Sequence, residues 1–189
     1  MNLKKTSMLV LVVFLISAIV LGQTASIQKA TEKEIIKKEL SKEEANKAIV
    51  VKWFSSFWGK TCDLKIVDEL AAPDMLLQYS LHAPRKGTKD IKAFMTDFRA
   101  AFPDLNFWGT TDLIAEGDYV VGRWEGGGTH TGIAFSDFLA GSLPAASGKK
   151  MHFTGTTVLK LKDGKIVEEI GLDDGATALV QLGILKVTK

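Results

Sequence analysis

The sequence predicts an α+β domain in which N-terminal helices pack on one face of a curved sheet. Helical spacing of apolar residues dominates before Pro103, and short β-branched and aromatic runs separated by tight turns dominate after it. A chain that places its helices before antiparallel strands is typical of the α+β class. The length of 189 residues and the hydrophobic content of 46% suit one globular domain with additional segments.

Residues 1–22 have the pattern of a secretory signal peptide. Two lysines precede an apolar run from Met8 to Leu21, and small and polar residues follow. An uncleaved membrane anchor is the alternative, but the run is shorter than the roughly 20 residues that a membrane span needs. The pattern therefore predicts cleavage near Gly22 or Ala25, a periplasmic or secreted protein, and no stable membrane anchor after cleavage.

The charge balance gives no indication of a nucleic-acid partner. Residues 1–22 contain two lysines and no acid, so 24 basic against 22 acidic residues become 22 against 22 after cleavage. No basic stripe with interleaved aromatic residues follows, which argues against nucleic-acid binding.

Cys62 is the only cysteine. An exported form would therefore have no internal disulfide, and its core alone would hold the fold.

Residues 23–45 are expected to form a charged helical spacer. Thr31 with Glu34, and Ser41 with Glu44, have the spacing of a capping box, so helices are predicted to begin at these positions. From residue 46 apolar residues recur at helical spacing, which is typical of a globular domain. Two adjacent apolar stripes predict a core helix, one with Ile49, Trp53 and Phe57 and one with Val50, Phe54 and Trp58.

Two further helices and an extended segment precede the sheet. Asp63 is suited to cap a short helix that ends at Pro73, and Met75 to Leu81 reads as an extended segment. Thr88 is suited to cap a third helix that stops at Pro103.

A β meander is predicted after Pro103, followed by a closing helix around Leu179. Turns are expected at residues 116–118, 126–128 and 162–164, and residues 136–150 are expected to form a long loop at the rim of a cavity or over it. The strand candidates are Leu105–Ala115, Tyr119–Glu125, Thr129–Phe135, Met151–Leu161 and Lys165–Asp173.

Residues 46–186 resemble the SnoaL-like polyketide cyclases, also called ester cyclases, in the order and spacing of several segments. These are AFPDLNF at 101–107, DLIAEGDYVVGRW at 112–124, GTHTG at 128–132, FTGTTVLKLKDGKIVEE at 153–169 and DGATALVQLG at 174–183. The resemblance implies the nuclear transport factor 2-like fold, a cone-shaped cup of three N-terminal helices on a curved mixed or antiparallel sheet. That fold also occurs in scytalone dehydratase and ketosteroid isomerase, so it does not define a reaction.

The resemblance implies that Asp174 is a general acid and base for an intramolecular aldol closure that needs no metal or cofactor. One carboxylate with a raised pKa can remove a proton from carbon and return one to oxygen. The residues alone leave a second interpretation open, because Asp174 is also well placed to cap the following helix. Asp173 is expected on the opposite face of the strand, away from the cavity.

Two histidines are further catalytic candidates. His130, in the GTHTG turn, either donates to a substrate carbonyl or bonds the backbone at the rim. His152 either supplies a second acid or lies partly exposed at a strand end.

Six residues are candidates to bind substrate. They are Trp53, Phe57, Gln78, Tyr79, Trp108 and Trp124. Arg123 and Trp124 must face opposite sides of their strand, and Trp124 is expected inside. The resemblance implies an Asp-His or similar pair after the second helix, where this chain has Leu77, Gln78 and Tyr79.

Two functions follow from these candidates. One is a cofactor-free cyclase or isomerase that acts on a small hydrophobic carbonyl compound. The other is a noncatalytic cup that binds a small hydrophobic molecule, or that forms a homodimer through its sheet.

Overall fold

The computed structural model describes residues 27–39 and 42–186, which fall into two compact units, residues 1–42 and 43–189. The predicted signal peptide lies outside the described residues, as does Ser41. In the first unit residues 27–39 form an exposed helix, which begins before Thr31. The Thr31 hydroxyl donates to the carbonyl of Ile27 at 2.9 Å, so Thr31 does not cap the helix as predicted. No helix among the described residues is long and apolar enough to cross a membrane.

The second unit begins with a helix that buries the predicted aromatic stripe. Residues 42–53 are helical and continue into the π-helix η1 (Phe54–Trp58). Trp53 and Phe57 are fully buried and stack with their ring centroids 4.6 Å apart. The wider π turn places Phe57 and the adjacent Trp58 side by side in the interior. The helix therefore provides one aromatic wall of the domain.

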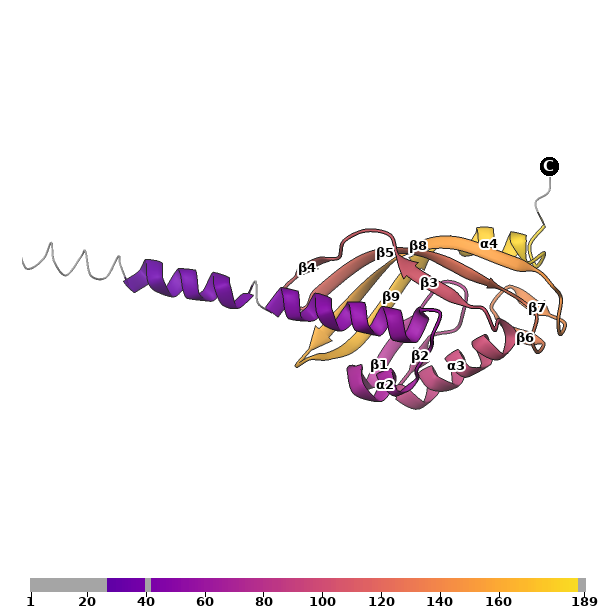
Figure 1. Cartoon of the computed structure of the whole chain (residues 1–189), viewed down its shortest axis with the longest axis horizontal. Coiled ribbons are helices and arrows are strands. Elements are labelled where there is room, and N and C mark those ends of the chain that lie inside the picture. Colours follow the sequence, from indigo (N-terminus) through magenta and orange to yellow (C-terminus); the bar gives the residue numbers. More distant parts are fainter. Residues whose placement is uncertain (1–26, 40–41, 187–189) are drawn as a thin grey trace, which may run out of the picture. The chain divides into compact units, whose positions relative to one another are not determined.

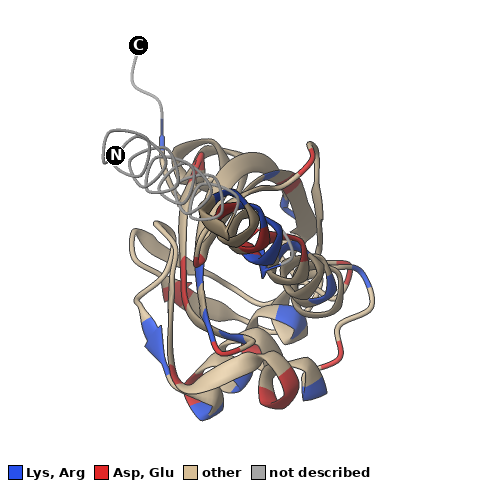
Figure 2. Ribbon diagram, turned by 90° about the vertical axis from the view of Figure 1, so that its left-hand side faces the viewer, with Lys and Arg blue, Asp and Glu red and all other residues tan. Residues whose placement is uncertain are grey.

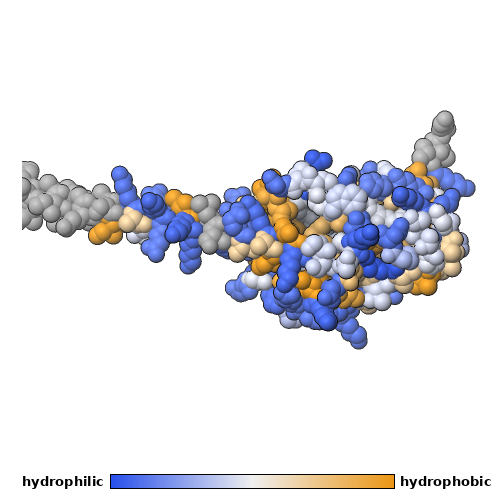
Figure 3. Space-filling view, in the orientation of Figure 1, coloured by the Kyte–Doolittle hydropathy of each residue, from blue (hydrophilic) through white to orange (hydrophobic). Residues whose placement is uncertain are grey.

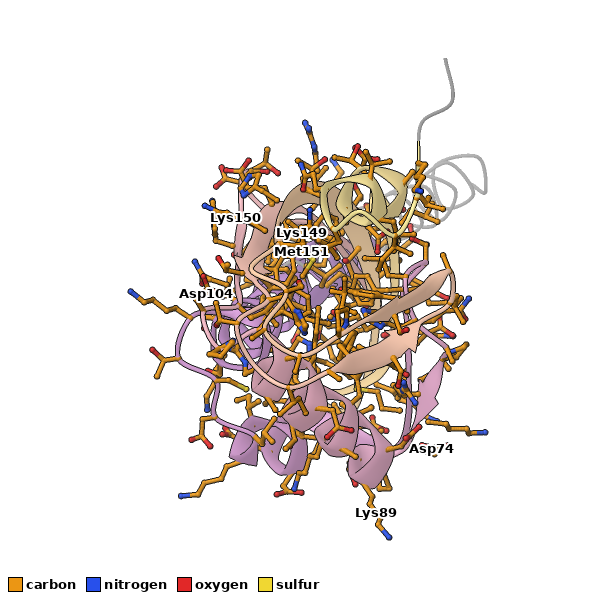
Figure 4. The ribbon with its side chains drawn as sticks, turned by 90° about the vertical axis from the view of Figure 1, so that its right-hand side faces the viewer. Asp74, Lys89, Asp104, Lys149, Lys150 and Met151 are labelled. Carbon is orange, nitrogen blue, oxygen red and sulfur yellow. The ribbon has the colours of Figure 1, made fainter. Side chains whose placement is uncertain are left out.

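Two more helices pack on the same side of the sheet (Figure 1). The predicted short helix is α2 (Lys65–Leu70), and the third is α3 (Thr88–Ala101). Apolar residues of α3 such as Phe94 and Phe98 face the interior, whereas Lys89 projects to solvent (Figure 4). This two-sided distribution follows from the apolar spacing read in the sequence.

Seven strands form one sheet in the part of the chain that the structure describes, in the order β2-β1-β9-β8-β5-β3 with β4 paired to β5. β1 and β9 run parallel, and the other pairs run antiparallel. The sheet is therefore mixed, and β9 lies between β1 and β8. The strands are β1 (Ala71–Gln78), β2 (Arg85–Lys86), β3 (Asn106–Gly109), β4 (Ile114–Glu116), β5 (Tyr119–Thr129), β8 (Lys150–Lys162) and β9 (Lys165–Asp173).

The prediction of a turn at residues 126–128 is wrong, because β5 runs unbroken through all three glycines. A Cβ on Gly127 would lie 1.9 Å from the carbonyl oxygen of Met151. Glycine at this position lets the backbones of β5 and β8 lie close together, and it does not turn the chain. The predicted separate strand Thr129–Phe135 is consequently absent, since β5 ends at Thr129.

The segment predicted as a long loop at 136–150 contains a small hairpin. It consists of β6 (Phe135–Phe138) and β7 (Gly141–Leu143), and Phe138 forms a β-bridge with His82. The last helix of the described residues is α4 (Gly175–Gln181), which packs against β8. Acidic and basic residues are interspersed along the described ribbon (Figure 2).

Candidate functional site

An inner cavity lies between the concave face of the sheet and the helices. Its free volume is about 20 Å³, enough for a water-sized chemical group. Side chains fill most of the interior around it (Figure 4). The lining is Phe54, Trp58, Tyr79, Leu81, His82, Phe98, Phe107, Trp124, Phe153 and Asp173. Three of these residues, Tyr79, His82 and Asp173, have titratable side chains in an otherwise apolar wall.

Asp173, the last residue of β9, provides the only carboxylate among these lining residues. Its Oδ1 accepts a hydrogen bond from the Ser80 hydroxyl. Burial raises the pKa of Asp173 above its ordinary value of 3.8, although the Ser80 hydrogen bond and the nearby His82 act in the opposite direction. A carboxyl group with a raised pKa is suited to exchange protons with a substrate.

His82 is held in one orientation by aromatic rings and by a carboxylate. Its ring is buried among Phe94, Phe98 and Phe138, and its Nδ1 lies 3.2 Å from Asp137 Oδ2 on β6. Burial alone would raise the pKa of Asp137, but hydrogen bonds from His82 and Arg85 hold this pKa below 3.8. The contact with Asp137 therefore fixes the orientation of the imidazole ring.

Glu169 lies behind the cavity wall in a cage of hydrogen-bond donors. It is fully buried, and it accepts from Trp53 Nε1 at 2.7 Å, Trp58 Nε1 at 2.8 Å and the Tyr79 hydroxyl at 2.6 Å. Burial raises the pKa of Glu169, while these three donors favour its ionised form. The cage fixes the positions of Trp58 and Tyr79, which both line the cavity.

A chain of hydrogen bonds extends from this cage across the sheet. The Tyr79 hydroxyl also lies 3.0 Å from Thr157 Oγ1, which accepts from Trp124 Nε1 at 2.8 Å. Burial and the neighbouring Glu169 raise the pKa of Tyr79 well above 10.0, so its phenol stays protonated. The phenol therefore gives its one proton to Glu169, and residues of β8 and β9 together fix the position of its ring.

Space for the ring of Tyr79 depends on a glycine in β9. A Cβ on Gly171 would lie 2.1 Å from Tyr79 Cε1. We therefore expect Gly171→Ala to displace the ring from Glu169 and to lower the free energy of unfolding by about 1–3 kcal/mol, measured by urea denaturation. Gly109→Ala is the control, because its Cβ would have no atom closer than 3.9 Å. Equal losses in the two variants would contradict this account of Tyr79.

A larger outer cavity adjoins the inner one. It has a volume of about 410 Å³ and lies between the helix of residues 42–58 and strands β3, β5 and β8. Phe54, Phe107 and Trp124 line both cavities and form the wall between them. Figure 3 shows hydrophobic surface beside this helix, in the region of β4.

The family model of the SnoaL-like polyketide cyclases matches residues 48–182. The chain belongs to this family. No curated protein shows significant similarity to the chain.

Solved structures similar to this SnoaL-like protein share its fold. A SnoaL-like polyketide cyclase from Jannaschia sp. CCS1 is 23% identical, with a TM-score of 0.63 over 76% of this chain and 95% of its own. A phenazine biosynthesis-related protein from Pseudomonas aeruginosa is 16% identical, with a TM-score of 0.65 over 82% and 95%. A protein with a ketosteroid isomerase-like fold from Catenulispora acidiphila is 18% identical, with a TM-score of 0.56 over 71% and 92%. The predicted fold class is confirmed.

The prediction that Asp174 faces the cavity of this SnoaL-like domain is wrong. Asp174 is exposed, and its Oδ1 accepts from the backbone N–H of Thr177 at 3.2 Å, so it caps α4. Asp173 takes the inward position that was expected for Asp174. Residues 169, 171 and 173 share the concave face because side chains alternate along β9.

Neither predicted catalytic histidine lines a cavity of the described residues. His130 is fully buried, with Nδ1 2.9 Å from Ser147 Oγ and Nε2 2.8 Å from the Ile133 carbonyl oxygen. Both ring nitrogens therefore bind the protein itself. His152 is half exposed on β8, with Nε2 3.8 Å from a Glu125 carboxylate oxygen. The structure does not bring these histidines to Asp173.

Three of the six predicted substrate-binding residues line a cavity. Tyr79 lines the inner cavity, Trp108 the outer one, and Trp124 both, as its predicted inward orientation requires. Trp53 and Phe57 are instead packed in the core, and Gln78 is exposed. Gln78 follows Leu77 by one residue in β1, so it points to the opposite face.

Three residues of the site were missed by sequence reasoning, namely Asp173, His82 and Glu169. A signal existed for Asp173 and Glu169, because their spacing of four places them on one face of a strand. His82 lies outside any regular run in the sequence, and its partner Asp137 is 55 residues away. No local pattern connects that pair.

Proposed function

We propose that this SnoaL-like protein is an acid–base catalyst for ring closure or isomerisation of a small hydrophobic carbonyl compound. The observation that carries the proposal is the inner cavity, where Asp173 and His82 lie in a largely aromatic lining. The reaction class requires only proton transfers to and from carbon and oxygen. These side chains can perform such transfers.

In the proposed reaction Asp173 removes a proton from the carbon next to a substrate carbonyl. The raised pKa of Asp173 makes its carboxylate a stronger base than an exposed one, and the aromatic wall excludes water from the developing enolate. His82 lines the same cavity and is the second side chain proposed to carry a proton. Tyr79 gives its only hydroxyl proton to Glu169, so its part in the proposal is to hold the cavity wall in place.

Deuterium exchange with a simple ketone tests this proposal. We expect the protein to accelerate the incorporation of solvent deuterium beside the carbonyl of 2-tetralone, measured by proton NMR in D₂O. Asp173→Asn should reduce the acceleration by about 10²–10⁴-fold, because the amide cannot accept the proton. The rate should also fall as the pH drops through the raised pKa of Asp173, since protonation removes the base.

Asp174→Asn is the matched control. It changes the neighbouring, exposed carboxylate, and asparagine caps a helix about as well as aspartate. Its exchange rate should equal that of the unchanged protein. No acceleration by the unchanged protein, or equal loss in both variants, would overturn the proposal and favour a noncatalytic binding function.

Export remains part of the proposal, supported by the pattern of residues 1–22. Mass spectrometry of the protein from the culture medium or periplasm should find a mature N-terminus near Gly22 or Ala25. A chain that keeps Met1 and stays with the cells would contradict export.

A further inference from the structure

His130 and Ser147 place an imidazole base in direct contact with a serine hydroxyl, outside the site described above. His130 Nδ1 lies 2.9 Å from Ser147 Oγ, and His130 Nε2 lies 2.8 Å from the Ile133 carbonyl oxygen. A carbonyl oxygen can only accept a hydrogen bond, so Nε2 carries the proton of the neutral ring. Nδ1 then has the lone pair, and the Ser147 hydroxyl donates to it.

This arrangement is the one that activates a serine for nucleophilic attack. Its signature is a nucleophile and a base within about 2.6–3.2 Å of each other, with the base oriented by a third group. His130 meets both conditions, because the Ile133 carbonyl holds its far nitrogen. The imidazole is fully buried against Phe102, with the ring centroids 5.0 Å apart, and this packing restricts its rotation away from Ser147.

The backbone beside Ser147 is strained. Ala146, the residue before it, has a φ of 51°, in the left-handed region that residues with a Cβ rarely adopt. Gly148, the residue after it, is also left-handed, with a φ of 69°. Strain at a residue other than glycine is typical of functional sites, where it holds a reactive group in place. Here it accompanies the sharp bend that brings the Ser147 hydroxyl to His130.

Backbone hydrogen bonds hold the two segments against each other. The N–H of His130 donates to the carbonyl oxygen of Lys149 at 2.8 Å, and the N–H of Gly148 donates to that of His130 at 2.9 Å. The N–H of Ala146 donates to the carbonyl oxygen of Gly132 at 2.9 Å. The hydroxyl and the imidazole are therefore in position before any reactant arrives.

We propose that Ser147 is a nucleophile, activated by His130, that takes an acyl group from small activated esters. Ser147 is half-buried between two exposed residues, and neither the inner nor the outer cavity includes it. Its reactants are therefore small acyl donors with a good leaving group, such as aryl acetates, which reach it from the surface. The pair is separate from Asp173 and His82, so it does not depend on the proposed function.

The acyl transfer requires only the ester and water. Ser147 Oγ forms a bond to the ester carbonyl carbon while its proton passes to His130 Nδ1, and the Ile133 carbonyl continues to accept the Nε2–H. The bond from that carbon to the leaving oxygen then breaks, and His130 returns the proton to this oxygen. Water releases the acyl group as a carboxylic acid by the same steps, with His130 again taking and returning the proton.

Labelling by diisopropyl fluorophosphate tests the nucleophile directly. The serine oxygen displaces fluoride from phosphorus, and tandem mass spectrometry of the tryptic peptide that contains both Ser142 and Ser147 locates the adduct. We expect Ser147 to react at least about 10²-fold faster than Ser142, an exposed serine of β7, since a positioned base contributes about 10²–10⁴-fold. In urea the two rates should become similar, because unfolding separates the pair. Similar rates in the folded protein would overturn the proposal.

His130→Asn tests whether His130 is the base. The asparagine amide oxygen can accept the hydrogen bond of Ser147 but cannot take up its proton. Labelling of Ser147 should therefore slow by about 10²-fold or more. Unchanged labelling in a folded variant, as judged by circular dichroism, would overturn the role of His130.

A second measurement does not depend on the folding of that variant. The unchanged protein should release 4-nitrophenolate from 4-nitrophenyl acetate at least about tenfold faster than Ser147→Ala does. Ser142→Ala is the matched control, and its rate should equal that of the unchanged protein. Equal release by the two serine variants would show that the contact between His130 and Ser147 is only structural.

Discussion

Replacing Glu169 with leucine is expected to lower the free energy of unfolding by about 3 kcal/mol. Leucine removes the shared acceptor of two buried indole N–H groups, those of Trp53 and Trp58, and each buried donor left without a partner costs about 1–3 kcal/mol. Tyr79 retains Thr157 as a partner. Removal of a buried charge offsets part of this loss at neutral pH.

The free energy of unfolding that Glu169→Leu loses should be larger at low pH than at neutral pH. Burial raises the pKa of Glu169 above 4.5, so the folded state binds the proton more tightly than the unfolded state does. This contribution to stability is complete below pH 4.5 and disappears as the pH rises through the raised pKa. The leucine variant lacks this contribution, so its deficit should be larger at about pH 4 than at about pH 7.

Urea unfolding at the two pH values measures both effects. Glu168→Leu is the matched control, because Glu168 is the adjacent residue and points to the other face of β9. It should change the free energy of unfolding by no more than about 0.5 kcal/mol. Similar losses in the two variants, or a deficit of the Glu169 variant that grows toward neutral pH, would show that the cage does not act as described.

Arg99→Met is expected to cost about 3 kcal/mol of stability. The Arg99 guanidinium donates to the carbonyl oxygens of Gly59, Trp58 at 3.3 Å and Leu105 at 3.0 Å. These carbonyls lie where η1 ends and where the chain enters β3, and hydrogen bonds from a charged donor contribute about 1.5–3 kcal/mol each. Methionine keeps much of the apolar stem and removes the donors.

Thermal and urea unfolding can measure the stability lost in Arg99→Met and compare it with the effect of the same substitution at a second arginine. Arg123→Met removes the same group from an exposed side chain on β5 and should be close to neutral. Arg99→Lys should recover only part of the stability, because one ammonium cannot match the planar set of donors. Full recovery with lysine would mean that charge alone, rather than the pattern of donors, holds these carbonyls.

The fold could be predicted because its main signals are local. Adjacent aromatic stripes marked the helix that ends in η1, and the turn at residues 162–164 marked the hairpin between β8 and β9. The error at residues 126–128 has a physical cause. Glycine relieves crowding between paired strands as well as permitting turns, and the sequence alone does not distinguish the two uses.

The site was less predictable because the residue that holds its wall in place, Glu169, is a buried acid. The resemblance assigned the cavity to Asp174, and alternation along the strand then placed Asp173 on the outer face. Once Glu169 is known to be buried, alternation turns Asp173 inward. Three donors from the helix of residues 42–58 and from the residue after β1 make this burial possible, and they meet only in the tertiary structure.

The central place of β9 has a consequence for how the chain reaches its native state during synthesis. The strand that joins β1 to the remainder of the sheet follows every other strand of the described sheet in the sequence, so it is the last of them to be synthesised. Until it emerges, β1 has no partner on that side, and the indoles of Trp53 and Trp58 have no acceptor. The nascent domain is therefore expected to fold late and in one concerted step. The helix that carries Trp53 can be completed only after Glu169, more than a hundred residues later in the chain, has been synthesised.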